Sequence, residues 1–337
     1  MALFTKFASN IEAMKSKLTV LYFSIWLGGT FWSVSGQFID AETAPKWYFA
    51  LFGGTFLCWM YGMSHFRSIP TTKKPHFTGI FLSISLCATA LAFHGLLQWS
   101  GLWTPQPMFP VCGNFDNPAG IASALAFSLP FSLHYTQSTC TPFRYTALAS
   151  TLFIACAIIA SESRAGILSM GCIFLLYFPM KWPKIGKALT FGFVMLFTAS
   201  SVFLYHYKKD SADGRLLIWQ CTWNMIKERP LYGYGYGGFQ ANYMDEQAQF
   251  FRTHPNSRYA QLADDVKSPF NEYLGVLTEF GFIGGTAMLL CAVVLFRMWR
   301  KHPGGSSRPA LLCLTAIAVF SLFSYPFRYP HTWILCM

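Results

Sequence analysis

The chain is poor in charge, and acidic residues are the scarcest part of that charge. Only 12% of its 337 residues are charged, and 14 are Asp or Glu against 25 Lys or Arg. Soluble domains carry roughly 25% charged residues, so the deficit argues against a water-exposed surface. Hydrophobic residues make up 53% of the chain and aromatic residues 18%. The composition therefore predicts a protein that faces lipid.

Other features are also absent. The ten cysteines include no Cys-x-x-Cys pair and no Cys/His spacing suited to zinc. No small-residue cleavage site follows the first apolar stretch, so Leu18 begins a retained span and not a signal peptide. The sequence contains no internal repeat. We therefore expect no metal site, and we expect the first span to be kept.

Long apolar runs recur along most of the chain. A helix needs roughly 17–25 residues to cross the hydrocarbon core, and these runs lack the in/out alternation of a membrane barrel. The predicted fold class is all-α: a polytopic transmembrane helical protein with about 9–10 spans. The predicted spans are 18–36, 46–63, 77–97, 117–135, 144–160, 164–181, 187–205, 271–297 and 309–325, with 329–337 as the start of a tenth.

The formal charge of +11 is explained by the orientation of these spans. With the N-terminus in the cytoplasm, the cytoplasmic segments hold fourteen Lys or Arg and the short outer segments hold three. Cytoplasmic loops of membrane proteins carry such an excess of basic residues. The charge is therefore a topology signal, and no nucleic-acid partner is expected.

The spans divide the chain into three regions. Residues 1–205 form an N-terminal seven-span membrane region, 206–270 a large polar loop on the side away from the cytoplasm, and 271–337 a C-terminal membrane region. The last apolar run has only about nine residues, too few to cross the bilayer. We therefore expect the C-terminal region to end in a re-entrant stretch or to be truncated.

The large loop contains a predicted surface helix followed by a glycine-rich turn. Leu216, Trp219, Trp223 and Ile226 recur three or four residues apart, which predicts an amphipathic helix over 215–228 with its two Trp side chains at headgroup depth. Pro230 and the run 233–238 end this helix. That run matches Gly-x-Gly-x-x-Gly, but it follows a helix and not a strand, so we interpret it as a flexible turn and not as a dinucleotide site.

Two arginines outside the predicted spans are candidates for binding an anion. Arg164 lies in a short outer hairpin, where a cation near the membrane needs an anionic partner. Arg215 lies at the predicted start of the amphipathic helix, where free amides and the helix dipole also favour an anion. A phosphate-bearing substrate and a structural pairing, with Glu162 or lipid for Arg164 and with Asp213 for Arg215, are open alternatives.

Polar side chains gather where the loop re-enters the membrane. They are Asp264, Asp265, Asn271 and Glu272, with Glu279 about two turns farther along the same span. A carboxylate entering a span is costly and is therefore a functional candidate, although the two aspartates are equally well explained as solvated loop residues. Gly281 and Gly284 in this span are typical of close packing between helices.

In order along the chain, these segments resemble the O-antigen ligase and polymerase family, bacterial membrane glycosyltransferases that use lipid-linked sugars. Gly113-Asn-Phe-Asp-Asn-Pro-Ala119 resembles the family's Phe-x-Asn-Pro opening of a span, and Ser163-Arg164-Ala-Gly166 resembles its Ser-Arg-x-Gly hairpin. Asp213-Gly-Arg215 with Trp219 resembles the start of its large periplasmic loop, and the turn at 233–239 resembles its glycine-rich stretch.

The family's signature is His-Asn, nine residues, Gly, two residues, Gly. Asn271, Gly281 and Gly284 keep this spacing, but Phe270 stands where the family has His. The resemblance covers roughly residues 110–300. Each motif is weak alone, whereas several in order around one loop are fairly specific.

The resemblance implies a fold similar to the C-type glycosyltransferases, in a bacterial inner membrane with the loop in the periplasm. It implies inverting transfer of a glycan from a polyprenyl diphosphate, such as undecaprenyl diphosphate, to a hydroxyl of a lipid or protein acceptor, without metal or cofactor. Such transfer belongs to lipopolysaccharide and polysaccharide biosynthesis, as O-antigen ligase, polymerase or protein glycosylation. Arg164 and Arg215 match the family's positions for holding the diphosphate.

The missing His leaves the acceptor hydroxyl without the family's base. We hypothesise that Glu272, or else Asp265, takes this role, because both carboxylates lie near position 270. Two alternatives remain open at this stage. One is a non-catalytic relative that only binds lipid-linked glycan, and the other is a transporter or flippase of a lipid-linked substrate, for which matched broken spans would be expected.

Overall fold

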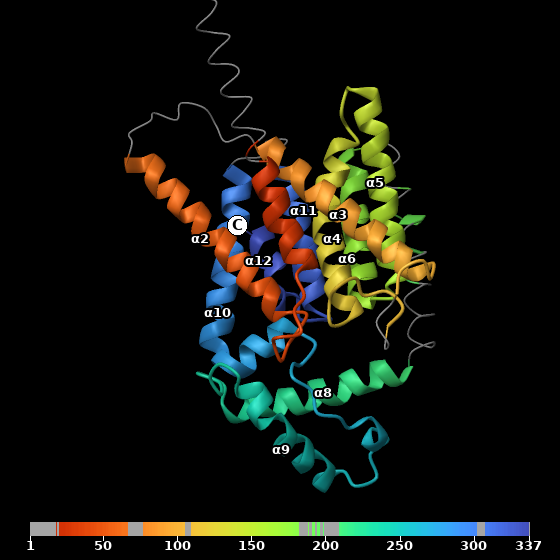
Figure 1. The fold of residues 1–337 in the computed structure, drawn as a ribbon. Coiled ribbons are helices and arrows are strands. Elements are labelled where there is room, and N and C mark those ends of the chain that lie inside the picture. Colours follow the sequence, from red (N-terminus) through yellow and green to blue (C-terminus); the bar gives the residue numbers. More distant parts are fainter. Residues whose placement is uncertain are drawn as a thin grey trace, which may run out of the picture. The chain divides into compact units, whose positions relative to one another are not determined.

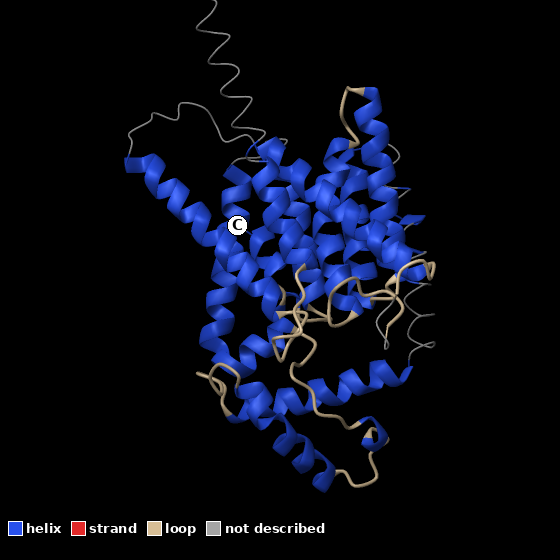
Figure 2. Cartoon of the chain, viewed as in Figure 1, coloured by secondary structure: helices blue, strands red, loops and turns tan. Residues whose placement is uncertain are grey.

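The computed structural model describes residues 18, 20–66, 77–104, 109–181, 209–301 and 307–336, with isolated positions between 188 and 198. The described residues form helices and no strand, which confirms the all-α prediction (Figures 1 and 2). The elements are a helix at Val20–Trp32, α2 (Ala44–Phe66), α3 (Phe77–Trp99), α4 (Pro118–Tyr135), α5 (Thr141–Ala160), α6 (Arg164–Lys181), α8 (Lys209–Glu228), α9 (Gly238–Thr253), η1 (Ala260–Leu262), α10 (Glu272–Lys301), α11 (Ser307–Ser321), η2 (Pro326–Arg328) and α12 (Pro330–Cys336).

The apolar runs became helices close to the predicted bounds. The predicted span 164–181, for example, coincides with α6. The predicted span 187–205 lies almost wholly outside the described residues. Among the described residues, three helices are long and apolar enough to cross a membrane: Gly79–Trp99, Thr141–Ala160 and Glu272–Lys301. By length and composition, the chain therefore carries membrane-spanning helices.

The chain divides into two compact units. The first unit comprises residues 1–170, 308–317 and 327–337, and the second comprises 171–307 and 318–326. In the first unit α3, α4 and α5 pack against one another, and α12 packs on α2 and α4. Helix α4 is buried along nearly its whole length, so it forms the centre of this bundle.

Helix α4 begins at the Asn-Pro of the Phe-x-Asn-Pro segment. The Asn117 side chain accepts a hydrogen bond from the Ala119 N–H at 2.7 Å, and Pro118 occupies the first helical position, where its missing N–H costs nothing. Its interior is rich in Ala and Ser, which let neighbouring helices approach. The motif therefore sets the start of the central helix.

A buried polar cluster ties the segment after α11 to the rest of the first unit. Lys46 is fully buried and donates to the carbonyl oxygens of Ser33 and Asn114 at 2.9 and 2.6 Å. Arg328 lies 3.8 Å from Asp116, which also accepts a hydrogen bond from the Tyr329 hydroxyl at 2.6 Å. These cations therefore hold loops and helix ends together.

The described part of the large loop is folded. Helices α8 and α9 pack against each other and against α10 (Figure 1). Their shared core contains Leu217, Cys221 and Met225 from α8 with Phe239 and Tyr243 from α9. The predicted helix at 215–228 is confirmed, although it begins six residues earlier, at Lys209.

The two Trp side chains of α8 differ in their contacts and exposure. The Trp219 indole donates to the Pro269 carbonyl at 2.9 Å and packs against the α8/α9 core. Trp223 is 48% exposed. The ring nitrogen of Trp219 is therefore satisfied within the second unit, and the depth of the two rings in the membrane stays a prediction.

Candidate functional site

Arg215 is held on α8 by the chain segment that follows α11. Its Nη1 donates to the Phe323 carbonyl at 3.0 Å, and its guanidinium lies 5.3 Å from the centre of the Phe270 ring. Because α8 begins at Lys209, Arg215 lies in the second helical turn, beyond the free amides of the helix start. The expected anion site at the helix N-terminus is therefore wrong, and any anion binding at Arg215 depends on the side chain itself.

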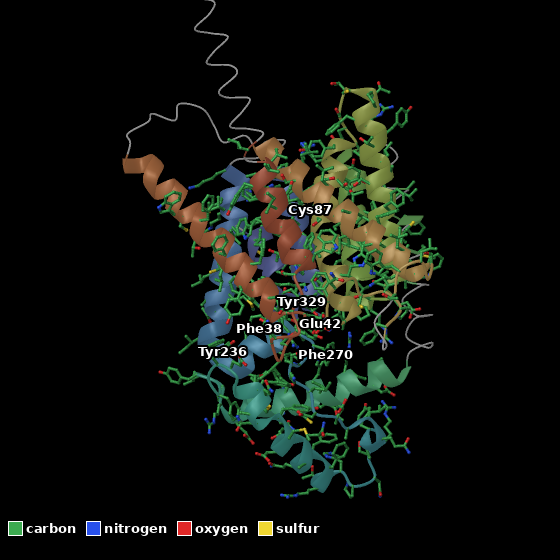
Figure 3. The ribbon with its side chains drawn as sticks, viewed as in Figure 1. Phe38, Glu42, Cys87, Tyr236, Phe270 and Tyr329 are labelled. Atoms are coloured by element: carbon green, nitrogen blue, oxygen red, sulfur yellow. The ribbon has the colours of Figure 1, made fainter. Side chains whose placement is uncertain are left out.

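Phe270, labelled in Figure 3, has a strained backbone, and its ring contacts Arg215 and Tyr325. Its φ is 51°, a conformation that is costly for a bulky side chain. Its ring centre lies 5.4 Å from that of Tyr325. A cation over an aromatic ring is stabilised by the ring's negative face. Phe270, which stands at the position of the family's His, therefore helps to orient Arg215.

Asn271 and Glu272 form the start of α10 directly after Phe270. The Asn271 side chain accepts a hydrogen bond from the Leu274 N–H at 3.1 Å, which makes it the N-cap. Glu272 is the first helical residue and is partly buried. Asp265 is exposed in the preceding loop, where its N–H donates to the Asp264 side chain at 2.8 Å. Of the two carboxylates, Glu272 is therefore the one that belongs to a helix, two residues after Phe270.

Arg164 belongs to the first unit, as the first residue of α6. Before it, Glu162 has a φ of 53°, and the Ser163 hydroxyl accepts a hydrogen bond from the Gly166 N–H at 3.3 Å. A Cβ at Gly166 would lie 2.7 Å from the Cβ of Ala122 on α4. The Ser-Arg-x-Gly segment therefore makes a tight hairpin in which glycine allows α6 to approach α4.

Gly281 breaks α10 and joins it to the glycine-rich turn. Its φ of 61° and ψ of −161° are not helical. The Phe282 N–H, which in a regular helix would donate to Thr278, donates to Pro230 at 2.8 Å. The Thr278 carbonyl accepts from Tyr234 at 2.9 Å. The turn therefore supplies the hydrogen bonds that the helix loses at the break.

The same exchange continues one residue farther along. The Glu279 carbonyl accepts from the Gly235 N–H at 2.8 Å, and the Ile283 N–H donates to Leu231 at 3.4 Å. A Cβ on Gly281 would overlap the Leu231 carbonyl. Gly281 thus permits a close approach, but to a turn and not to another helix. The expectation of a flexible turn is wrong, because its backbone is bonded to α10.

Glu279 has a structural role at this junction. Its side chain accepts a hydrogen bond from the Gly237 N–H at 3.0 Å and another from the Phe239 N–H. These donors lie at the start of α9, whose N-cap Gly237 has no side chain to cap the helix. A carboxylate at a helix start satisfies free amides and complements the dipole. Glu279 therefore links α10 to α9.

Tyr234 in the same turn serves as a donor and not as a base. Burial and the hydrogen bond from its hydroxyl to Glu228 raise the pKa of Tyr234 to about 12. The Arg229 guanidinium lies 4.5 Å from the centre of the Tyr234 ring. The phenol therefore stays protonated at neutral pH and fastens the turn to the end of α8.

The second unit brings some of the sequence-predicted site residues together. Arg215 meets Phe270, which directly precedes Asn271 and Glu272, and Gly281 lies farther along α10. The contact of Arg215 with the Phe323 carbonyl could not be inferred from the sequence, because more than one hundred residues separate them. Among the described residues, no group of three His, Cys, Asp or Glu is placed to hold a metal ion.

Residues 149–289 match the family model described as O-antigen ligase. The matched interval runs from α5 into α10 and so includes Arg164, Arg215, the glycine-rich turn and both motif glycines. A comparison with curated proteins gave no match. The family expected from the motifs is thereby confirmed for this part of the chain.

Proposed function

Because residues 149–289 belong to the O-antigen ligase family, we propose that the chain transfers a glycan from a polyprenyl-diphosphate carrier to an acceptor hydroxyl at the periplasmic face of the inner membrane. The observation that carries the proposal is Arg215, oriented by Phe270 and the Phe323 carbonyl at the start of α10. A fixed guanidinium suits an anionic leaving group, and the partly buried Glu272, two residues after the ring that the guanidinium contacts, suits activation of a hydroxyl nucleophile.

The arginines act on the diphosphate. A sugar diphosphate leaves readily once its growing negative charge is held, and the planar guanidinium binds phosphate oxygens in a bidentate manner. Arg215 is the principal clamp, because its position is fixed by two contacts within the second unit. Arg164, at the start of α6 in the first unit, is a further candidate for binding phosphate, on the strength of the family resemblance. In this scheme no metal is needed for the leaving group.

Glu272 is proposed as the base. The acceptor oxygen bonds to the anomeric carbon on the face opposite the diphosphate, and the bond from that carbon to the diphosphate oxygen breaks with its electron pair. The acceptor proton passes to the Glu272 carboxylate. The configuration at the anomeric carbon is therefore inverted. Phe270 cannot accept a proton, whereas the Glu272 carboxylate lies two residues farther along, at the start of α10. Asp265 is the less favoured substitute because it is exposed in a loop.

A non-catalytic binder of lipid-linked glycan is the second candidate. The observation in its favour is Phe270 itself, which fills the position of the family's His with a side chain that packs on Arg215. In that case the arginine would still bind diphosphate, but no proton would be taken from an acceptor. The two candidates differ in turnover and not in donor binding.

Complementation tests the proposal. A strain lacking its O-antigen ligase or polymerase would receive the wild-type chain, Arg215→Ala, Arg215→Lys or Arg252→Ala, and glycan attachment would be read on a gel. Arg252 is an exposed arginine on α9 and serves as the matched control. We expect glycan with the wild type and the control, none with Arg215→Ala and little with Arg215→Lys. Failure of the wild type, with confirmed insertion and donor present, would favour the non-catalytic candidate.

A further inference from the structure

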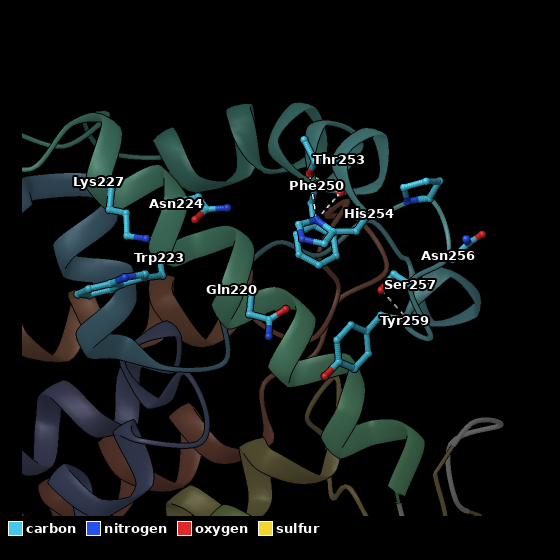
Figure 4. A pocket seen from close by; sticks show the side chains of 11 residues that line it. Gln220, Trp223, Asn224, Lys227, Phe250, Thr253, His254, Asn256, Ser257 and Tyr259 are labelled. Atoms are coloured by element: carbon cyan, nitrogen blue, oxygen red, sulfur yellow. Dashed lines mark hydrogen bonds between the residues drawn. The ribbon is translucent and has the colours of Figure 1, made fainter.

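A pocket of about 750 Å³ lies between α8, the C-terminal end of α9 and the loop that follows α9 (Figure 4). This volume is in the range of ligand-binding pockets. Arg215, Phe270 and Glu272 are not among its lining residues. The pocket is therefore separate from the proposed transfer site, although both belong to the second unit.

Aromatic rings and amides dominate the pocket. Trp223 and Phe250 offer ring surface, and Gln220, Asn224 and Asn256 offer side-chain amides. Gln220 and Asn224 project from α8, the helix that also carries Trp223 (Figure 4). An amide both donates and accepts hydrogen bonds, as a sugar hydroxyl does. Ring faces suit the C–H surface of a sugar, because their negative face attracts positively polarised hydrogens.

The charge of the lining restricts the ligand further. Lys227 contributes a positive charge at the Trp223 end, and none of the described residues that line the pocket is acidic. A cationic ligand would therefore meet repulsion without compensation. A neutral saccharide, or one that carries acidic groups, fits this lining.

Side-chain contacts at the end of α9 and in the following loop fix two walls of the pocket. The rings of Phe250 and His254 are stacked with centres 4.7 Å apart, and the Thr253 hydroxyl is 2.9 Å from Nδ1 of His254. Tyr259 is largely buried, and its hydroxyl accepts a hydrogen bond from Arg258 at 2.9 Å. Fixed walls reduce the entropy lost on binding.

We propose that this pocket between α8 and α9 binds a segment of a saccharide chain, with Trp223 as the stacking platform and Asn224 as a hydroxyl partner. The choice of a saccharide rests in part on the proposed function, which deepens here into a second glycan contact away from the transfer site. A lipid surface is the competing occupant. It is less favoured because Gln220 interrupts the exposed α8 face between Leu216 and Trp223, whereas membrane-surface helices present a continuous apolar face.

The test uses the full chain in lipid nanodiscs. The probe is the soluble oligosaccharide released by mild acid from the host strain's lipopolysaccharide, with binding followed by saturation-transfer NMR and Trp fluorescence. Trp223→Ala and Asn224→Ala are compared with Leu216→Ala, which removes an exposed side chain of the same helix outside the pocket. We expect Trp223→Ala to weaken binding about tenfold or more and Leu216→Ala to leave it unchanged.

Two results would overturn this proposal. One is absence of binding by the folded wild-type protein, or equal binding by all variants. The other is quenching of Trp fluorescence by brominated lipids in the nanodisc that disappears in Trp223→Ala, with saccharide binding unaffected, which would assign this face to lipid. Binding without any glycan transfer by the wild type would remove the proposed function and leave the pocket standing. Glycan transfer by a wild-type protein that shows no saccharide binding, with transfer unchanged in Trp223→Ala, would remove the pocket proposal and leave the proposed function standing.

Discussion

Helices α4 and α10 are both apolar, but they are stabilised in different ways. Helix α4 is unbroken and buried between its neighbours, and its start is capped by Asn117. Helix α10 is largely exposed along its apolar part, and Gly281 breaks it where the turn at 230–235 takes over its hydrogen bonds. Burial defines the first region, whereas a few specific backbone contacts define the second. The proposed chemistry depends on the second.

The largest expected effect concerns Lys46, in the region defined by burial. Lys46→Met would leave the carbonyls of Ser33 and Asn114 without their donor and remove the cation near Asp116. Breaking a buried charged network by removing one partner costs about 3–5 kcal/mol. We expect a large drop in thermal unfolding temperature in detergent. Unchanged stability would mean that this cluster does not hold the first unit together.

Gly281→Ala is the corresponding change in the second region. It forces a left-handed φ on a side chain and brings Cβ onto the Leu231 carbonyl, at a cost of about 2–3 kcal/mol. We expect rapid proteolysis within 206–270 while α3 to α5 stay protected. The control is Gly214→Ala on α8, where a Cβ meets nothing within 4 Å and should stabilise by about 0.5–1 kcal/mol. Equal behaviour of both variants would contradict the proposed junction.

Glu279→Ala is expected to have a smaller effect, which is confined to the start of α9 in the second unit. Loss of the carboxylate leaves the N–H groups of Gly237 and Phe239 without their cap, which costs about 1 kcal/mol. Hydrogen exchange should accelerate in the first turn of α9 and stay unchanged in α4. Glu279→Gln should retain part of the protection. If transfer is lost in Glu279→Gln while α9 stays protected, the residue has a catalytic role and not the structural one assigned here.

Sequence reasoning succeeded where burial decides the structure. The bounds of α6 and α4 follow from apolar runs and from Asn117-Pro118 at a helix start. The sequence did not predict the break in α10, which depends on one backbone contact between Gly281 and the turn at 230–235. A glycine in an apolar run predicts close packing, and nothing local distinguishes that from the break at Gly281.

The folded loop was only partly predictable. The start of α8 was missed because residues 209–214 show no apolar periodicity. Helix α9 did carry a signal, since Phe239, Tyr243 and Phe250 recur at helical spacing and pack toward α8. Asn271 and Gly281 mark the start and the break of α10, whereas the carbonyl that holds Arg215 comes from the distant residue 323. Such long-range partners are set by tertiary packing and leave no local pattern.

The most direct test of the account is a transfer assay with the purified chain in nanodiscs, a polyprenyl-diphosphate-linked glycan and an acceptor. We expect turnover by the wild type, a loss of 10²-fold or more in Glu272→Gln, and partial recovery when Phe270→His is added to that variant. Arg215→Ala should abolish turnover both in the wild type and in the Glu272→Gln variant that carries Phe270→His. Turnover by Glu272→Gln equal to that of the wild type would contradict the assignment of Glu272 as the base.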